Sequence, residues 1–169
     1  TIVAVGAGNV ILVSTNRGVT WSVPAAGVTG AHSAVAVLGP LEWYVGTLDT
    51  TGKVWYTETA GAIWTQLVLP WAALTTVNDI VWATNEDGWI AATRSGPTAT
   101  IFQTTFGGAI WGESNTSRLP PTLPVFARAN RIAVPTVPDL MVDANNIAIA
   151  GLGGGFTDGV IFIGVAPVL

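Results

Sequence analysis

Three copies of one eight-residue pattern decide the fold: STNRGVTW at residues 14–21, TETAGAIW at 57–64 and TTFGGAIW at 104–111. Each copy begins with a hydroxyl residue, has glycine four positions later and ends with tryptophan seven positions later. The copies start 43 and 47 residues apart. A period of that length is typical of proteins in which similar units stack or surround an axis. We therefore expect a row of similar units.

Short runs of β-branched and aromatic residues precede each copy, and glycine-rich or polar segments separate the runs. Such runs predict strands joined as antiparallel hairpins. No helix is expected, because a 3.6-residue pattern is missing and 20 Gly and 10 Pro interrupt the chain. The expected strands are 2–5, 9–14, 32–38, 42–47, 53–57, 64–69, 77–84, 88–93 and 99–104.

These strands predict an all-β fold, a β-propeller built from four-stranded antiparallel blades. We expect one domain over residues 1–169, with about 3.5–4 blades at 1–30, 31–72, 73–118 and 139–169. The blades would hold three, four, four and three strands, those of the last at 139–142, 146–150 and 159–164. Such a ring has unsealed edges, which the chain termini or another subunit must cover.

A proline-rich insertion occupies residues 119–138 and includes Pro120, Pro121 and Pro124. Proline cannot donate a ladder hydrogen bond, so this insertion is expected to be a connecting loop that leaves the sheet and returns. Long loops of this kind often carry contacts with partners.

The first copy resembles the Asp-box, or bacterial neuraminidase repeat, whose pattern is Ser/Thr-x-Asp-x-Gly-x-Thr-Trp/Phe. Ser14, Asn16, Gly18, Thr20 and Trp21 match every defined position if Asn stands for Asp. The resemblance implies that the box lies in the turn between the third and fourth strands of a blade and is mainly structural. The Gly would supply a positive φ, and the Trp would pack against the next sheet.

The second and third copies depart from this pattern at the acidic and threonine positions. The acidic position holds Thr59 and Phe106, and the threonine position holds Ile63 and Ile110. The family includes sialidases, sortilin-like receptors and viral propellers, so the resemblance implies no single activity. The copies keep the hydroxyl residue, glycine and tryptophan as Thr57, Gly61 and Trp64, and as Thr104, Gly108 and Trp111.

The composition favours a protein that hides part of its surface in an assembly. Half of the residues are apolar, only 9% are charged, and the mean hydropathy is +0.54. A net charge of −4 disfavours nucleic acid as a partner. No apolar run reaches the length of a membrane span, and cysteine is absent. The chain starts at Thr1 without a leader, so we expect a processed chain or part of a longer polypeptide.

No catalytic, cofactor or metal site is predicted. A sialidase would need three arginines, a Tyr–Glu pair and an acid–base Asp, and only Arg94 ends a strand within a complete repeat. His32, the only histidine, is expected at the surface or at a strand edge. The glycine-rich residues 3–11 and 151–155 and the acidic residues 85–88 are expected to be plain turns.

The predicted function is therefore a non-catalytic structural or attachment propeller of an extracellular or virion assembly, such as a phage particle. Partners would be further copies of the chain or other subunits. A secreted glycan-binding lectin is the alternative, and an Asp-box glycosidase comes third. Candidate contacts with a ligand or partner are Trp71, Arg94, Pro120, Pro121, Arg128 and Arg131.

Overall fold

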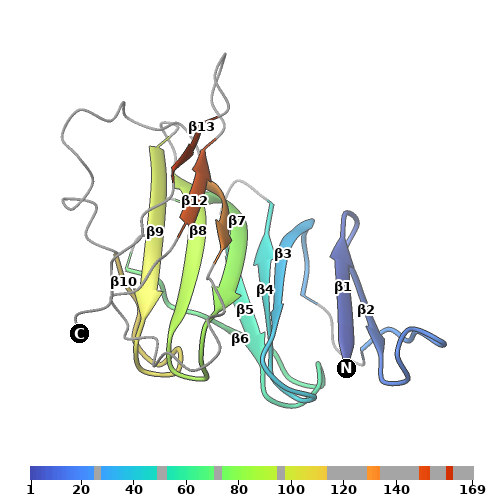
Figure 1. Cartoon of the computed structure of the whole chain (residues 1–169). Helices are drawn as coiled ribbons and strands as arrows, with labels where there is room; N and C mark the ends of the chain where they lie inside the picture. Colours follow the sequence, from blue (N-terminus) through green and yellow to red (C-terminus); the bar gives the residue numbers. More distant parts are fainter. Residues whose placement is uncertain are drawn as a thin grey trace.

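The computed structural model of the chain is all-β, with antiparallel strands in four sheets (Figure 1). It describes residues 1–24, 28–48, 53–70, 74–94, 98–113, 129–133, 149–152 and 159–161, and none of these is helical. The strands are β1 (Ile2–Gly6), β2 (Val10–Ser14), β3 (His32–Val37), β4 (Trp43–Thr47), β5 (Val54–Thr57), β6 (Thr65–Gln66), β7 (Leu74–Trp82), β8 (Gly88–Arg94), β9 (Thr98–Thr104), β10 (Gly112–Glu113), β11 (Ala129–Ala133), β12 (Ile149–Leu152) and β13 (Gly159–Ile161).

Each sheet is a meander in which consecutive strands pair. The first sheet holds β1 and β2, the second β3 to β6, the third β7 to β10 and the fourth β11 to β13. The nine strands expected from the sequence between residues 2 and 104 are all present, with ends that differ by a few residues. The fold class is thus all-β and antiparallel, and the described strands form a row of sheets that does not close into a ring (Figure 1).

Apolar side chains fill the two spaces between the first three sheets. We call the face of a sheet that is turned toward the preceding sheet its leading face, and the opposite one its trailing face. Val3 and Ile11 on the trailing face of the first sheet pack with Trp43 and Val45 on the leading face of the second. Burying each such side chain stabilises the fold by about 1.5–3 kcal/mol.

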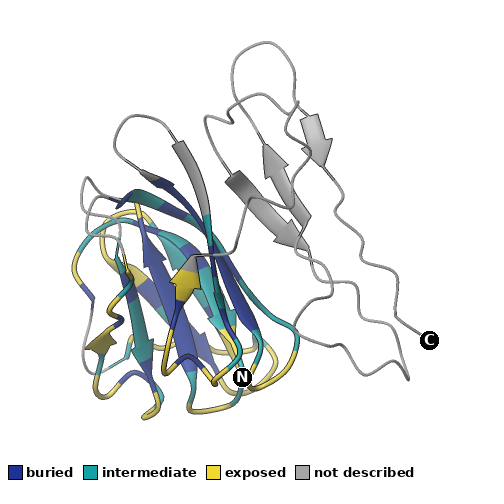
Figure 2. Ribbon diagram, turned by 90° about the vertical axis from the view of Figure 1, so that its left-hand side faces the viewer, coloured by how far each residue is buried: buried dark blue, intermediate teal, exposed yellow. Residues whose placement is uncertain are grey.

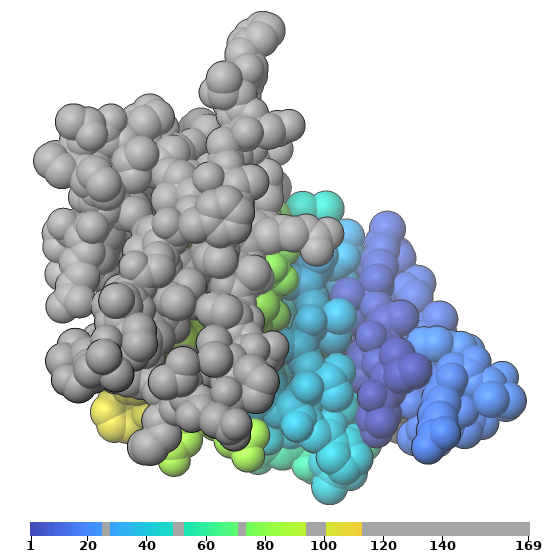
Figure 3. Space-filling view, in the orientation of Figure 1, coloured from blue at the N-terminus to red at the C-terminus, as the bar shows by residue number. Residues whose placement is uncertain are grey.

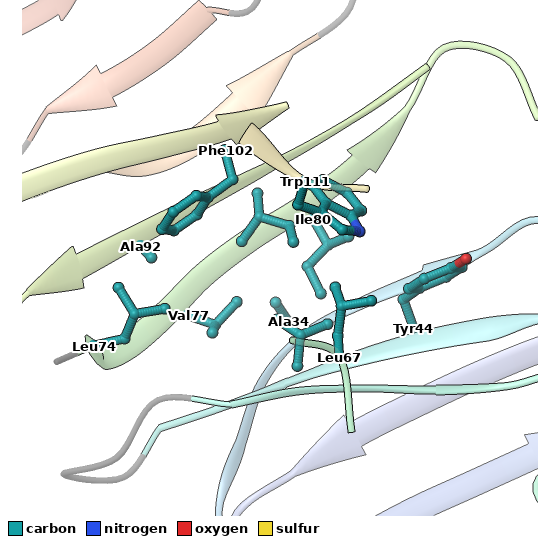
Figure 4. Packing of buried hydrophobic residues seen from close by; sticks show 11 residues of the cluster. Ala34, Tyr44, Leu67, Leu74, Val77, Ile80, Ala92, Phe102 and Trp111 are labelled. Atoms are coloured by element: carbon teal, nitrogen blue, oxygen red, sulfur yellow. The ribbon is translucent and has the colours of Figure 1, made fainter. Parts of the chain in front are cut away.

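The second and third sheets share a larger core (Figure 4). Tyr44 and Val54 on the trailing face of the second sheet pack with Ile80, Ile90 and Phe102 on the leading face of the third. Buried residues are concentrated in the central strands, whereas the turns are exposed (Figure 2). The alternation of faces along each strand thus produces a stack of sheets with apolar layers between them.

Two expectations about the strands are wrong. The first unit has two strands rather than three, because the segment after its motif contributes only an isolated bridge between Val13 and Ser22. The insertion 119–138 is not a loop throughout, since β11 lies within it and pairs with β12. β11 lies between Pro124 and Pro135 and contains no proline itself. Its backbone N–H groups can therefore donate the hydrogen bonds that pair it with β12. The strand expected at 139–142 lies outside the described residues.

The part of the chain that the structure describes holds no helix with the length and apolar character that a membrane crossing requires.

Candidate functional site

A buried hydroxyl group organises each of the three repeated turns. Ser14, Thr57 and Thr104 are the last residues of β2, β5 and β9, and all three are buried. The backbone N–H of the glycine four residues later donates to this hydroxyl oxygen, over 2.8 Å at Gly18, 3.0 Å at Gly61 and 3.2 Å at Gly108. The hydroxyl therefore satisfies a turn amide that would otherwise be buried without a partner.

The side chain two residues after the hydroxyl closes the turn in the first two copies. Asn16 Oδ1 accepts from the backbone N–H of Thr20 (2.9 Å), and Thr59 Oγ1 accepts from that of Ile63 (2.8 Å). Asn16 Nδ2 also donates to Thr20 Oγ1 (2.8 Å). Phe106 occupies this position in the third copy and has no acceptor atom. Thr59 therefore replaces the family's acidic residue in this role, whereas Phe106 does not.

Each turn also places two consecutive residues in the left-handed region. The glycine has a φ of +87° at Gly18, +81° at Gly61 and +82° at Gly108. A Cβ atom is unfavourable in this region, which explains why glycine is needed there. The preceding residue is left-handed as well, with a φ of +61° at Arg17 and +53° at Ala60. The turn geometry is thus the same in all three sheets.

The tryptophan that ends each motif lies in three different environments. Trp111 is 5% exposed and lies in the core between the second and third sheets. Its ring packs edge-on against that of Trp82, with 5.6 Å between the ring centroids. Trp64 is partly buried, 6.4 Å from the ring of Trp43. Trp21 is 44% exposed and donates from Nε1 to Gly18 O (3.1 Å). Trp21 thus departs from the expected packing, because no described sheet lies on its side of the first sheet.

The repeated turns lie at one end of the first three sheets, and this end is largely exposed (Figures 1 and 2). Large apolar residues are among the exposed residues there. The loop from β3 to β4 lies at the same end, since Ala60 N–H donates to Leu41 O (2.9 Å). This surface was not predicted from the sequence; in the sequence it consists of apolar residues at turn positions that require neither glycine nor tryptophan. We call it the turn rim, and it consists of Val19, Leu41, Ile63, Phe106 and Ile110.

The charges on the same turns are mostly negative. Glu58 and Glu86 are exposed beside the apolar residues, and Arg17 is the one cationic side chain on the described turns at this end. Gly107 N–H donates to Glu86 O (3.0 Å), which connects two of these turns. A rim that combines apolar and acidic groups fits a protein surface better than a polyanion.

Tyr44 and Glu42 form the closest counterpart to a Tyr–Glu pair in the described residues. Tyr44 Oη donates to Glu42 Oε1 over 3.2 Å. Tyr44 is buried, with ring centroids 5.8 Å from Tyr56 and 4.9 Å from Trp82. Burial, reinforced by the charge of Glu42, raises the pKa of Tyr44 well above its usual value of 10.0. The phenol therefore stays protonated and packs as a core aromatic, which disfavours a nucleophilic role.

His32 is buried at the start of β3, an edge strand, so the strand-edge expectation is confirmed and the surface expectation is wrong. Although β3 is an edge strand, β1 and β7 from the neighbouring sheets lie against it. Burial lowers the pKa of His32 from 6.5, and the backbone of Val28 opposes only part of this effect. His32 is therefore a neutral ring packed in the interior of the protein.

The acidic residues 85–88 form a turn whose polar groups bond to one another. Thr84 Oγ1 donates to Asp87 Oδ2 (3.0 Å) and accepts from the backbone N–H of Asp87 (2.9 Å). The described residues contain no group of three His, Cys, Asp or Glu side chains that could hold a metal ion. The glycine-rich residues 3–11 form the β1–β2 hairpin, with Gly8 and Asn9 left-handed at its turn.

The other candidate contact residues are not brought together by the described structure. Arg94 ends β8 and Arg131 lies on β11, which places their backbones on different sheets. Trp71, Pro120, Pro121 and Arg128 lie outside the described residues.

The structure of the chain is weakly similar to solved structures. It is similar to a solved structure described as "YCF48 bound to D1 peptide", with 12% sequence identity and a TM-score of 0.33. The similarity covers 94% of this chain and 72% of that chain. No protein-family model and no curated protein matches the sequence. The functional proposals therefore rest on the residues of this chain.

Proposed function

We propose that this chain is a non-catalytic β-propeller that serves as a structural or attachment component of an extracellular or virion assembly. The observation that carries the proposal is the turn rim, a row of exposed apolar side chains on a molecule with few charges. Large exposed apolar side chains grouped at one end of a molecule favour contact with other macromolecules.

The repeated motif supports a scaffold role for the residues that would otherwise suggest a ligand site. The hydroxyl, amide and glycine groups of each motif are engaged with their own turn, as the contacts of Ser14, Asn16 and Thr57 illustrate. Groups used in this way are not available to coordinate a substrate.

Two assays on the full chain and one variant test this proposal. A fluorogenic sialoside should not be hydrolysed, and a glycan array should show no binding above background. Hydrolysis that Arg94→Ala abolishes would overturn the non-catalytic proposal and favour an Asp-box glycosidase. A variant with Phe106→Lys and Ile110→Lys in the turn rim should lose attachment to the assembly while its far-ultraviolet circular dichroism stays unchanged.

Glycan binding is the second candidate, and one observation favours it. Trp21 is the exposed tryptophan among the described residues, and an exposed indole can stack on a sugar ring. Binding to a glycan array that Trp21→Ala removes, by a chain that stays monomeric, would favour a lectin over a structural component.

A further inference from the structure

The leading face of the first sheet is equivalent to two faces that are buried elsewhere in the molecule. The register of the strands defines the equivalence, because in each sheet one residue pairs with the hydroxyl residue that begins the motif. This residue is Ile2 in the first sheet, Trp43 in the second and Gly88 in the third. By the same register, Ala4 corresponds to Val45 and Ile90, and Leu12 corresponds to Trp55 and Phe102. These positions, with the terminal tryptophan, make up the leading face of each sheet.

Burial differs at most of these equivalent positions, although Trp55 is partly covered as Leu12 is. Trp43 is 1% exposed and Phe102 is fully buried, each under the sheet that precedes it. Ile2 is 44% exposed, as is Trp21, and Ala4 and Leu12 are only partly covered. The first sheet thus presents at one end of the row a surface that the fold buries twice (Figure 3).

The glycines of the motif show the same difference. A Cβ atom added at Gly61 would lie 2.7 Å from Pro24 Cβ, and one added at Gly108 would lie 2.9 Å from Tyr44 Oη. Pro24 and Tyr44 belong to the unit that precedes each motif. A Cβ added at Gly18 would meet only Trp21 of its own turn, at 3.8 Å. The preceding unit therefore packs against the motif twice, and the first motif has no such partner among the described residues.

The side chains on the leading face of the first sheet indicate which kind of partner could cover it. Residues 1–24 contain Arg17 as their one charged side chain, and the face itself is built from Ile2, Ala4, Leu12 and Trp21. Interface centres are depleted in charge and enriched in aromatic residues. At both of its other occurrences this kind of face is covered by a sheet of this same repeat. A sheet built from this repeat is thus the surface that complements the leading face of the first sheet.

We propose that the leading face of the first sheet binds a sheet of a second copy of this chain. The proposal rests on the proposed function, for which it names one partner and one interface. The contact continues the stacking inside the chain, with Ile2 and Trp21 in the roles of Trp43 and Trp64. Such a contact is heterologous, because the leading face of one copy meets a different face of the next, and contacts of this kind build rings or open rows of copies.

Sedimentation equilibrium of the full chain tests the contact. The wild type should reach at least twice the chain mass of 17.4 kDa as its concentration rises. Trp21→Lys and Ile2→Lys should each weaken the association by about 30-fold, the typical loss for a central interface residue. Val68→Lys is the matched control, because Val68 is 88% exposed and lies outside the face, and it should associate like the wild type. Equal association of all four proteins would overturn the proposal.

A second measurement separates a free face from a face covered within one chain. The protein has no cysteine, so Ile2→Cys introduces a single thiol whose reaction with a maleimide can be followed. The proposal predicts slow labelling in concentrated solution and fast labelling on dilution. A monomer with a reactive thiol would show a free face, and a monomer with a protected thiol would show closure within the chain; either result overturns the proposal. Neither result affects the sialoside and glycan assays, so the proposed function can stand or fail separately.

Discussion

The first and third repeated turns have the same backbone and opposite surroundings. Both have a buried hydroxyl that accepts from a left-handed glycine four residues later, yet Trp111 is buried and Trp21 is half exposed. The difference lies in what precedes each unit: the second sheet covers the third motif, and no described sheet covers the first. A repeated sequence thus fixes its turn by local hydrogen bonds, whereas the burial of its tryptophan depends on a neighbouring sheet.

The largest predicted difference between the two turns concerns their tryptophans. Trp111→Ala should lower the free energy of unfolding by about 3–5 kcal/mol, because it leaves a cavity in the core beside Trp82. Trp21→Ala, measured on the monomer, should cost less than about 1 kcal/mol, since Trp21 is 44% exposed and no described sheet packs on it. Urea denaturation of both variants measures this comparison, and equal losses would contradict it.

The next largest difference in the free energy of unfolding is expected between substitutions of the glycines in the first and third turns. Gly18→Ala should cost about 1–2 kcal/mol, since it forces a Cβ into the left-handed region. Gly108→Ala should cost about 1–3 kcal/mol more, because its Cβ would also overlap Tyr44 Oη. The same denaturation experiment checks both variants. A larger loss for Gly18→Ala would mean that the first motif is covered in the monomer.

A smaller effect is expected at the position two residues after the hydroxyl. Asn16→Ala should lower the free energy of unfolding by about 1 kcal/mol, since the N–H of Thr20 loses its acceptor. Phe106→Ala should leave the stability within about 0.5 kcal/mol, because Phe106 is exposed and accepts no hydrogen bond. If thermal unfolding showed equal shifts for the two, the assigned role of Asn16 would be incorrect.

The smallest predicted effect is a pH dependence that comes from His32, on the strand against which both β1 and β7 lie. Because burial lowers its folded-state pKa below 6.5, the unfolded chain takes up a proton first as the pH falls. The stability contributed by neutral His32 is thus fully present above pH 6.5 and is lost as the pH falls toward the lowered value. Urea denaturation between pH 7 and about 5 should show this loss, and His32→Asn should reduce it. An unchanged slope in the variant would assign the dependence to other groups.

The sequence was sufficient to predict the parts of this fold that depend on local patterns. The nine strands between residues 2 and 104 and the turns at Gly18, Gly61 and Gly108 follow from alternation, turn residues and the hydroxyl-to-glycine spacing. The burial of His32 could not be predicted, because it depends on strands from two other sheets. β11 was not predicted, because the prolines on both sides of it indicated a loop and the proline-free run between them is short. The turn rim was missed because apolar residues in turns lack a periodic signal.

Hydrogen–deuterium exchange at two protein concentrations tests the central comparison most directly. The amides of β1, β2 and the first turn should become more protected at the higher concentration, because a second copy then covers the leading face of the first sheet. The third turn, which the second sheet already covers, should exchange at the same rate in both samples. Equal exchange of the first turn at both concentrations would show that no second copy covers this face.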